Sequence, residues 1–284
     1  MLSRLCHPPP PRYSRRERKT KAPVPPATDA DLDADPETLL ALAARLARAA
    51  GEAVLALRAR GVAIETKPDD SPVTEADRAA EALILAGLAA TGIPVVAEEE
   101  VASGVAAAPA PLYWLVDPLD GTREFAAGRP DFAVNIGLVR DGRPVLGAVA
   151  LPATGEVFAG LVGAGAWKED ATGRRPIAAR RAPEAGPVVF ASRQYADDPQ
   201  LAAFVAARPG ALVVTAGSAL KFCRVAEGAA DLYPRFGPTM EWDTAAPQAV
   251  VEAAGGSVTT WGGEALRYGK SGWTNPGFLC RGLA

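Results

Sequence analysis

The segment from Trp114 to Thr122, Trp-Leu-Val-Asp-Pro-Leu-Asp-Gly-Thr, constrains this chain more than any other stretch. Its apolar part, Tyr113 to Val116, predicts a buried β-strand that leads into a tight Pro/Gly turn. Asp117 and Asp120 therefore lie where a strand ends and a helix can begin. At that helix start the backbone N–H groups of residues 121–123 lack intrahelical partners. Carboxylates that suit hard cations, beside amides that suit an anion, predict a metal-assisted phosphate site.

Taken alone, Asp-x-x-Asp-Gly is a common surface turn, because Asp and Gly favour local hydrogen bonds and positive φ. Three further segments change this interpretation: Ala97-Glu98-Glu99-Glu100, Val73-Thr74-Glu75-Ala76-Asp77 and Glu241-Trp242-Asp243-Thr244-Ala245-Ala246. With them, the chain resembles the lithium-sensitive, magnesium-dependent phosphomonoesterases of the inositol monophosphatase superfamily, over roughly residues 37 to 281. The resemblance implies the α+β fold of that superfamily, a layered αβαβα sugar-phosphatase architecture.

Composition narrows the chemistry. The chain has 284 residues and 49% hydrophobic content, yet no apolar run approaches the ~18 residues of a spanning helix, so we expect no integral membrane segment. A net charge of −3 argues against a general nucleic-acid binder. His7 is the only histidine, so metal chemistry must use oxygen ligands. The cysteines, Cys6, Cys223 and Cys280, fit reduced thiols in a cytosolic protein.

Three regions are expected. Residues 1–35 are rich in proline and basic residues, poor in apolar ones and without a secretory apolar region, so we predict a disordered extension. Residues 36–155 should form an N-terminal α+β lobe with most of the metal ligands, and residues 156–284 a C-terminal α/β lobe that determines specificity. Helices are predicted at 36–57, 75–90, 199–207, 218–227 and 244–254, and strands at 94–97, 113–116, 132–139, 145–151, 157–161, 188–191, 212–215 and, as an edge strand, 232–234.

The metal ligands follow from the resemblance. Matching positions imply that the side chains of Glu98, Asp117, Asp120 and Asp243 and the carbonyl of Leu119 hold Mg²⁺. Two ions are expected, and in the family a third, more weakly held ion assists. Asp117 is the best candidate to bridge two ions, since it ends the buried strand. For Asp243 considered alone, a helix N-cap is the commoner role of an Asp at such a position, but the adjacent Trp242 and Ala245-Ala246 match the family and favour the ligand role.

Thr122 and Asp77 match the pair that activates water in this family. A threonine hydroxyl at a helix start can hold a water in line with phosphorus, and a carboxylate behind it can accept the proton. For Asp77 alone, a helix cap or a surface charge is the alternative. Lys67 is interpreted either as a phosphate neutraliser or as loop surface.

Residues 217–223, 226–228 and 232–239 look like the bacterial 3′(2′),5′-bisphosphate nucleotidases of the CysQ type. That branch converts adenosine 3′,5′-bisphosphate, a by-product of sulfate activation, to AMP and phosphate. A bisphosphate needs a second anion site away from the metals, and Ser218, Lys221 and Arg235 are the candidates for the 5′-phosphate. Each of the three is otherwise a cap or a surface cation. The resemblance places the scissile phosphate on Glu98, Leu119, Asp120, Gly121, Thr122 and Asp243.

Two other functions stay open. An inositol-1-phosphate or sugar-bisphosphate phosphatase would use the same metals, and a monophosphate enzyme would not require Lys221 and Arg235. A metal- or nucleotide-binding regulator without catalysis would not need Thr122 and Asp77. The expected partner is a small nucleoside bisphosphate, not nucleic acid. The expected location is the cytoplasm, with peripheral association at the inner membrane as the alternative, and the sequence leaves the oligomeric state open.

Overall fold

The computed structural model describes residues 35–61, 64–66, 72–105 and 108–283. The expected disordered extension and the role of Lys67 lie outside these residues, apart from Asp35. Within them, two long helices form an outer layer: α1 (Pro36–Arg60) and α2 (Glu75–Leu88). Asp35 caps α1 by accepting from the backbone N–H of Thr38 at 3.0 Å, and proline follows at the first helical position. Both helices lie where the sequence predicts them.

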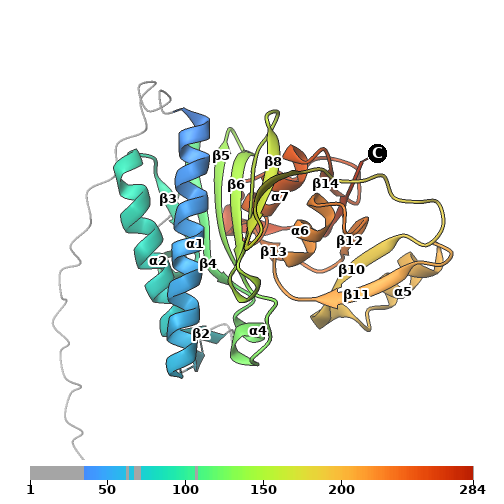
Figure 1. The fold of residues 1–284 in the computed structure, drawn as a ribbon, viewed down its shortest axis with the longest axis horizontal. Helices are drawn as coiled ribbons and strands as arrows, with labels where there is room; N and C mark the ends of the chain where they lie inside the picture. Colours follow the sequence, from blue (N-terminus) through green and yellow to red (C-terminus); the bar gives the residue numbers. More distant parts are fainter. Residues whose placement is uncertain (1–34, 62–63, 67–71, 106–107, 284) are drawn as a thin grey trace, which may run out of the picture.

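A seven-stranded sheet packs under this layer (Figure 1). Its strands follow chain order: β3 (Val95–Ala97), β4 (Leu112–Asp120), β5 (Ala133–Arg140), β6 (Arg143–Leu151), β7 (Glu156–Leu161), β8 (Gly165–Asp170) and β9 (Gly173–Ile177). Among the described strands of this sheet, only β3 and β4 pair in parallel. The lobe boundary near residue 155 stays a prediction, and strands β7 to β9 continue the first sheet to Ile177.

The opposite face of this sheet is covered by α7 (Ala245–Ala253). The helix lies unusually close, because a Cβ atom at Gly137 would meet the backbone N of Ala246 at 2.8 Å, and one at Gly147 would overlap the Ala246 carbonyl. Small residues on both sides therefore let the two backbones touch. This close packing fixes where the N-terminus of α7, just after Asp243, meets the sheet.

The second sheet has the order β11–β10–β12–β16–β14. Its strands are β10 (Val188–Ser192), β11 (Leu212–Ala216), β12 (Leu232–Arg235), β14 (Ser257–Thr260) and β16 (Phe278–Arg281). α6 (Leu220–Ala226) and α7 lie between the two sheets. α5 (Pro199–Ala206) covers the outer face, since Phe204 packs with Leu232 whereas the next strand residue, Tyr233, contacts Phe222 of α6. Figure 1 shows the resulting αβαβα layers, as the resemblance implies.

Two predicted details are wrong. β12 is an inner strand, not an edge. Its pairing with β10 is confined to Val189 and Leu232, so Pro234 faces no β10 donor or acceptor and is tolerated there. The helix predicted from residue 218 begins at Leu220, because Ser218 has a left-handed backbone with φ of 49°.

The remaining short elements are α3 (Glu98–Ala102), α4 (Thr122–Ala126), η2 (Ala89–Thr91), η3 (Pro152–Thr154), η4 (Arg193–Tyr195), η5 (Ser271–Trp273), and the strand pairs β1 (Ile64–Thr66) with β2 (Pro72–Thr74) and β13 (Thr239–Met240) with β15 (Thr274–Asn275). In the part of the chain that the structure describes, no helix has the length and apolarity needed to cross a bilayer.

Candidate active site

Residues 114–120 form the end of β4, and Gly121 and Thr122 follow it. The strand runs to Asp120 rather than stopping at Val116, with its pairing to β5 shifted between Asp117 and Asp120. Asp117 is 1% exposed, and its Oδ1 accepts from the backbone N–H of Leu119 at 3.0 Å. Gly121 then turns the chain into α4 with φ of 88°, where a side chain would be strained. Both carboxylates are thus held on a rigid, buried support.

A cleft of about 870 Å³ opens above this turn. It gathers ten of the residues singled out from sequence: Glu98, Asp117, Leu119, Asp120, Gly121, Thr122, Ser218, Lys221, Arg235 and Asp243. They come from elements far apart in the chain, including β4, α3, α6 and the turn before α7. A smaller cavity of about 330 Å³ lies elsewhere, at the start of α1 and beside β6, and holds none of them.

Four carboxylates repel one another across this cleft. Burial raises the pKa of Asp117 well above its usual range, and the charges of Glu98, Asp120 and Asp243 add to the effect. Burial, with Asp120 and Glu98, likewise raises the pKa of Asp243. Asp243 precedes α7 and is not its N-cap, since Thr244 occupies that position. Its Oδ2 accepts from the backbone N–H of Met240 at 3.0 Å.

The donor set fits hard divalent cations. All the candidate ligands are oxygens, and four carboxylates would balance the charge of two Mg²⁺ ions. Asn135 pairs in register with Asp117 and is fully buried, and among the described residues no donor reaches its Oδ1. An ordered water bound to a cation would satisfy such an oxygen. Within the same residues, no three His, Cys, Asp or Glu side chains are already close enough to form a metal cage.

Thr122 contacts both Asp77 and the turn of residues 117–121. Its Oγ1 is 3.2 Å from Asp77 Oδ1 and 3.0 Å from the carbonyl oxygen of Leu119. Asp77 lies in the first turn of α2 and is 1% exposed, which excludes a surface charge. A hydroxyl that donates to Asp77 keeps lone pairs to accept a proton from a water in the cleft.

The start of α6 contacts the turn of residues 117–121 directly. The backbone N–H of Ala219 donates to Asp120 Oδ2 at 2.5 Å, across 99 positions of sequence. Ser218 is therefore not the first residue of an anion-binding helix, and the amide that follows it is already committed to a carboxylate. Its Oγ accepts from the N–H of Leu220 at 3.3 Å.

Lys221 and Arg235 line the same cleft, and both already have protein partners. Lys221 is 3% exposed and donates to the carbonyls of Ser218 at 2.6 Å and Ala216 at 3.3 Å. Burial lowers its pKa to about 8, although the nearby charge of Asp120 opposes this shift. Arg235 donates to Ser192 Oγ at 3.0 Å and to the carbonyls of residues 237 and 238. These hydrogen bonds therefore hold both positive charges in fixed positions at the cleft.

Sequence reasoning missed three supports of the site. Asn135 donates to Asp120 Oδ2 at 3.4 Å. Glu81 is 5% exposed and accepts from the backbone N–H of Glu99 at 2.9 Å, which holds the start of α3 beside Glu98. Asp131 accepts from Arg193 at 2.6 Å and from the N–H of Gly217 at 2.5 Å. The only available signal was a polar residue within an apolar pattern, as for Asn135 between Val134 and Ile136.

Comparisons with known proteins agree with this geometry. The model of the inositol monophosphatase family matches residues 35–279. The 3′(2′),5′-bisphosphate nucleotidase CysQ of Salmonella typhimurium is 44% identical over 82% of this chain and 96% of its own length, and that of Escherichia coli K12 is 42% identical over the same shares.

Solved structures are similar as well. CysQ from Bacteroides thetaiotaomicron, described as a bacterial member of the inositol monophosphatase family, has a TM-score of 0.74 and 33% identity, covering 87% of this chain and 98% of its own. An inositol monophosphatase from Anabaena has a TM-score of 0.68 and 28% identity, covering 86% and 90%. The family match spans the first sheet, the second sheet except for the last two residues of β16, and every described residue of the cleft, and on this ground the chain belongs to the inositol monophosphatase family.

Proposed function

We propose that this protein is a magnesium-dependent phosphomonoesterase that hydrolyses the 3′-phosphate of adenosine 3′,5′-bisphosphate, giving AMP and phosphate. One observation carries the proposal: the cleft that holds the carboxylates Glu98, Asp117, Asp120 and Asp243 is also lined by the cations Lys221 and Arg235. A substrate with a reacting phosphate and a second, unreactive phosphate matches that combination of charges. The relatives named above carry the same activity in their names.

Glu98, Asp117, Asp120, Asp243 and the carbonyl of Leu119 would hold two Mg²⁺ ions. When bound, the ions would act as Lewis acids on the phosphoryl oxygens and the leaving 3′-oxygen. Without them, the negative charges of the carboxylates, which add to burial in raising the pKa of Asp117 and Asp243, would also repel a phosphate.

Thr122 and Asp77 would activate the water. The water donates its proton toward Thr122 Oγ1, whose own proton passes to Asp77 across the 3.2 Å contact. The water oxygen attacks phosphorus and the bond from phosphorus to the 3′-oxygen breaks. The leaving 3′-oxygen takes up a proton from solvent, Asp77 returns its proton to solvent, and inorganic phosphate leaves with AMP. The buried position of Asp77 keeps bulk water from competing for that proton.

Lys221 and Arg235 would bind the 5′-phosphate. Arg235 presents a planar guanidinium that lies over the ring of Tyr195 at 4.4 Å, which fixes its plane. Lys221 supplies positive charge from the start of α6, where its ammonium donates to the carbonyl of Ser218 in the preceding turn. Neither group touches the reacting phosphate, so each acts through binding and orientation.

Replacing Arg235 with Ala tests this assignment. The variant should lose kcat/KM for adenosine 3′,5′-bisphosphate by ~10–150-fold, the ~1.5–3 kcal/mol of a charge-assisted contact. Its kcat/KM for 3′-AMP, which has only the scissile phosphate, should hardly change. Arg174→Ala is the control, since it removes one positive charge from an exposed pair with Glu169 outside the cleft. Equal losses with both substrates would reassign Arg235 to the fold or to the reacting phosphate.

A further inference from the structure

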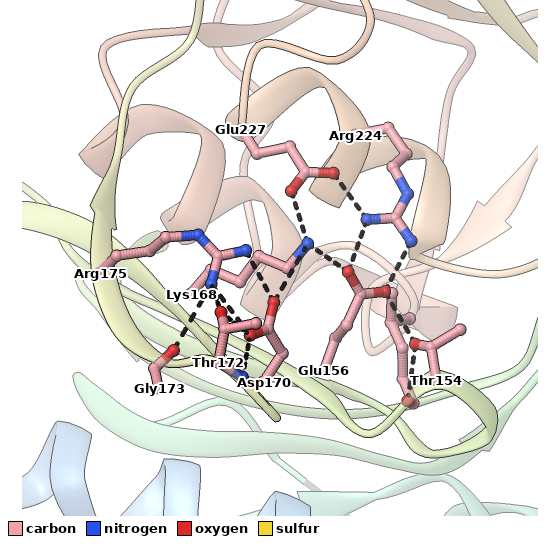
Figure 2. A network of polar contacts seen from close by, with 10 residues as sticks. Thr154, Glu156, Lys168, Asp170, Thr172, Gly173, Arg175, Arg224 and Glu227 are labelled. Atoms are coloured by element: carbon pink, nitrogen blue, oxygen red, sulfur yellow. Dashed lines mark hydrogen bonds and ion pairs between the residues drawn. The ribbon is translucent and has the colours of Figure 1, made fainter.

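Four charged side chains form a closed ring between the first sheet and α6 (Figure 2). Glu156 begins β7 and Lys168 lies within β8, whereas Arg224 lies in the last turn of α6 and Glu227 is its C-cap residue. We call these four residues the charge ring. They line neither cavity described above.

Every member of the charge ring contacts two others. Arg224 donates to the two carboxylate oxygens of Glu156 at 3.0 and 2.6 Å, and to Glu227 Oε1 at 2.6 Å. Lys168 donates to Glu227 Oε2 at 2.8 Å and forms an ion pair with Glu156. Two positive and two negative groups therefore cancel within the ring.

The charge ring is largely shielded from water. Glu156 is 8% exposed and Lys168 7%. The Lys168 ammonium lies 5.0 Å from the centre of the Phe158 ring, and the Arg224 guanidinium lies 5.8 Å from it, so an aromatic floor closes one side. Removing one member of such a ring leaves a buried charge without compensation, whereas removing an opposite pair does not.

The other end of α6 reaches the active site. Its N-terminal side carries the Ala219 amide, which binds Asp120 at 2.5 Å, and Lys221, which faces the cleft. The helix has only 7 residues, far below the ~12–15 at which an isolated helix becomes marginally stable in water. Its position therefore depends on contacts with the rest of the fold, and the charge ring provides the polar contacts at its C-terminal end.

We propose that the charge ring is a positioning device, which anchors α6 to β7 and β8 and thereby keeps the Ala219 amide and Lys221 aligned with Asp120. The four ring residues act through α6 and touch neither substrate nor metal. This inference rests on the proposed function, because it assigns the ring to the alignment of a metal ligand and a phosphate-binding lysine.

The double variant Glu156→Met/Arg224→Met tests the proposal. It removes one cation and one anion and leaves Lys168 paired with Glu227, so the protein should fold with a melting temperature near that of wild type. Its kcat/KM for adenosine 3′,5′-bisphosphate should fall about tenfold, less than the ~10²-fold that a 1 Å misplacement can cost. Arg175→Met is the matched control. Arg175 extends the same network at its exposed side, and its hydrogen bonds stay within residues 170–173.

A second measurement separates positioning from general stability. Hydrogen exchange of the backbone amides of residues 220–226 should become faster in the double variant, while exchange in α1 and α2 stays at the wild-type rate. A role in stability alone would leave exchange unchanged or raise it throughout the chain. Loss of activity without faster exchange in α6 would also overturn the proposal.

Wild-type kcat/KM together with wild-type exchange in the folded double variant would refute the inference directly. If the double variant does not fold, Glu156→Gln is measured by the same two criteria, since it keeps the size of the side chain. The exchange measurement needs no substrate. A wild-type enzyme that prefers another phosphate ester would therefore overturn the proposed function, while exchange in α6 still decides on the charge ring.

Discussion

At the scale of single residues, the site combines buried like charges with two residues that form a relay. Thr122 and Asp77 come from α4 and α2, elements between which β3, α3 and β4 lie in sequence, yet their oxygens lie 3.2 Å apart. Burial raises the pKa of Asp117, and the charges of the neighbouring carboxylates add to the effect. Because such contacts act as units, single substitutions in them should behave in characteristic ways.

Thr122→Ala should lower kcat for adenosine 3′,5′-bisphosphate by about 10²-fold or more with little change in KM, since the hydroxyl serves the transition state more than binding. Asp77→Asn should have a similar effect. The double variant should lose little more than either single variant, because one relay has been broken twice. Steady-state kinetics on the three proteins measure this, and losses that multiply would show that the two residues act independently.

Asp117→Asn should lower kcat more than tenfold, beyond ~1.4 kcal/mol of transition-state stabilisation. Without metal, the variant should melt at a higher temperature than wild type, because one buried like charge is gone. Its stabilisation by millimolar Mg²⁺ should be smaller than that of wild type, because it binds the ions less tightly. Thermal melts with and without Mg²⁺ test both points, and an unchanged Mg²⁺ response would exclude Asp117 as a ligand.

At the scale of elements, the position of two helices determines the cleft. α7 touches the first sheet backbone to backbone at Gly137 and Gly147, and α6 is held between Asp120 and the charge ring. Asp243 and Lys221 reach the cleft only because these helices lie where they do. Substitutions far from the cleft should therefore affect catalysis.

Gly147→Ala should reduce both stability and activity. A Cβ at this position would overlap the Ala246 carbonyl, and overpacking of a close contact typically costs about 1–3 kcal/mol. The displaced α7 should carry Asp243 with it, so kcat should fall in protein that remains folded. Gly262→Ala is the control, because a Cβ there would meet only Thr260 Oγ1 at 3.5 Å. Denaturant unfolding and kinetics on both variants decide, and wild-type behaviour of Gly147→Ala would contradict the packing argument.

The charge ring should also make the free energy of unfolding depend on pH in acidic solution. Burial by itself would raise the pKa of Glu156, but hydrogen bonds from Arg224, Lys168 and Thr154 outweigh it and lower the pKa to about 2, from 4.5. A carboxylate with a lowered pKa contributes stability above its unfolded pKa and loses it as pH falls through the folded one. The contribution of Glu156 should therefore be complete above pH 4.5 and disappear toward pH 2.

Glu156→Gln removes that titration. Between pH 4.5 and 2 the free energy of unfolding should fall less steeply in the variant than in wild type. Urea unfolding at several pH values gives the slopes. Identical slopes in the two proteins would show that Glu156 is not engaged in the ring in solution.

At the scale of the whole molecule, the sequence predicts the order of the layers and the residues of the cleft well, and their supports poorly. Asp117 and Asp120 were predictable because an apolar strand and a Pro/Gly turn are local features. The contact of Asp120 with the Ala219 amide spans 99 positions and leaves no local pattern. Ser218 looks like a helix cap from its side chain, and only its backbone, with φ of 49°, shows otherwise.

The residues that support the site could not be predicted for a related reason. A charged residue in a sequence predicts exposure, and Glu156, Lys168 and Glu81 are buried because their partners come from other elements. Pro234 predicts an edge strand, yet it occupies an inner strand whose pairing with β10 is confined to Val189 and Leu232. In each case tertiary pairing overrides a residue preference.

The central claim is the division of one cleft between a reacting and an unreactive phosphate. It is tested most directly by kcat/KM for adenosine 3′,5′-bisphosphate, inositol-1-phosphate and fructose-1,6-bisphosphate at one fixed Mg²⁺ concentration. The account predicts that the nucleoside bisphosphate exceeds inositol-1-phosphate by at least ~10²-fold, because inositol-1-phosphate has no second phosphate for Lys221 and Arg235, and that it also exceeds fructose-1,6-bisphosphate. A wild-type enzyme that prefers inositol-1-phosphate would contradict the account.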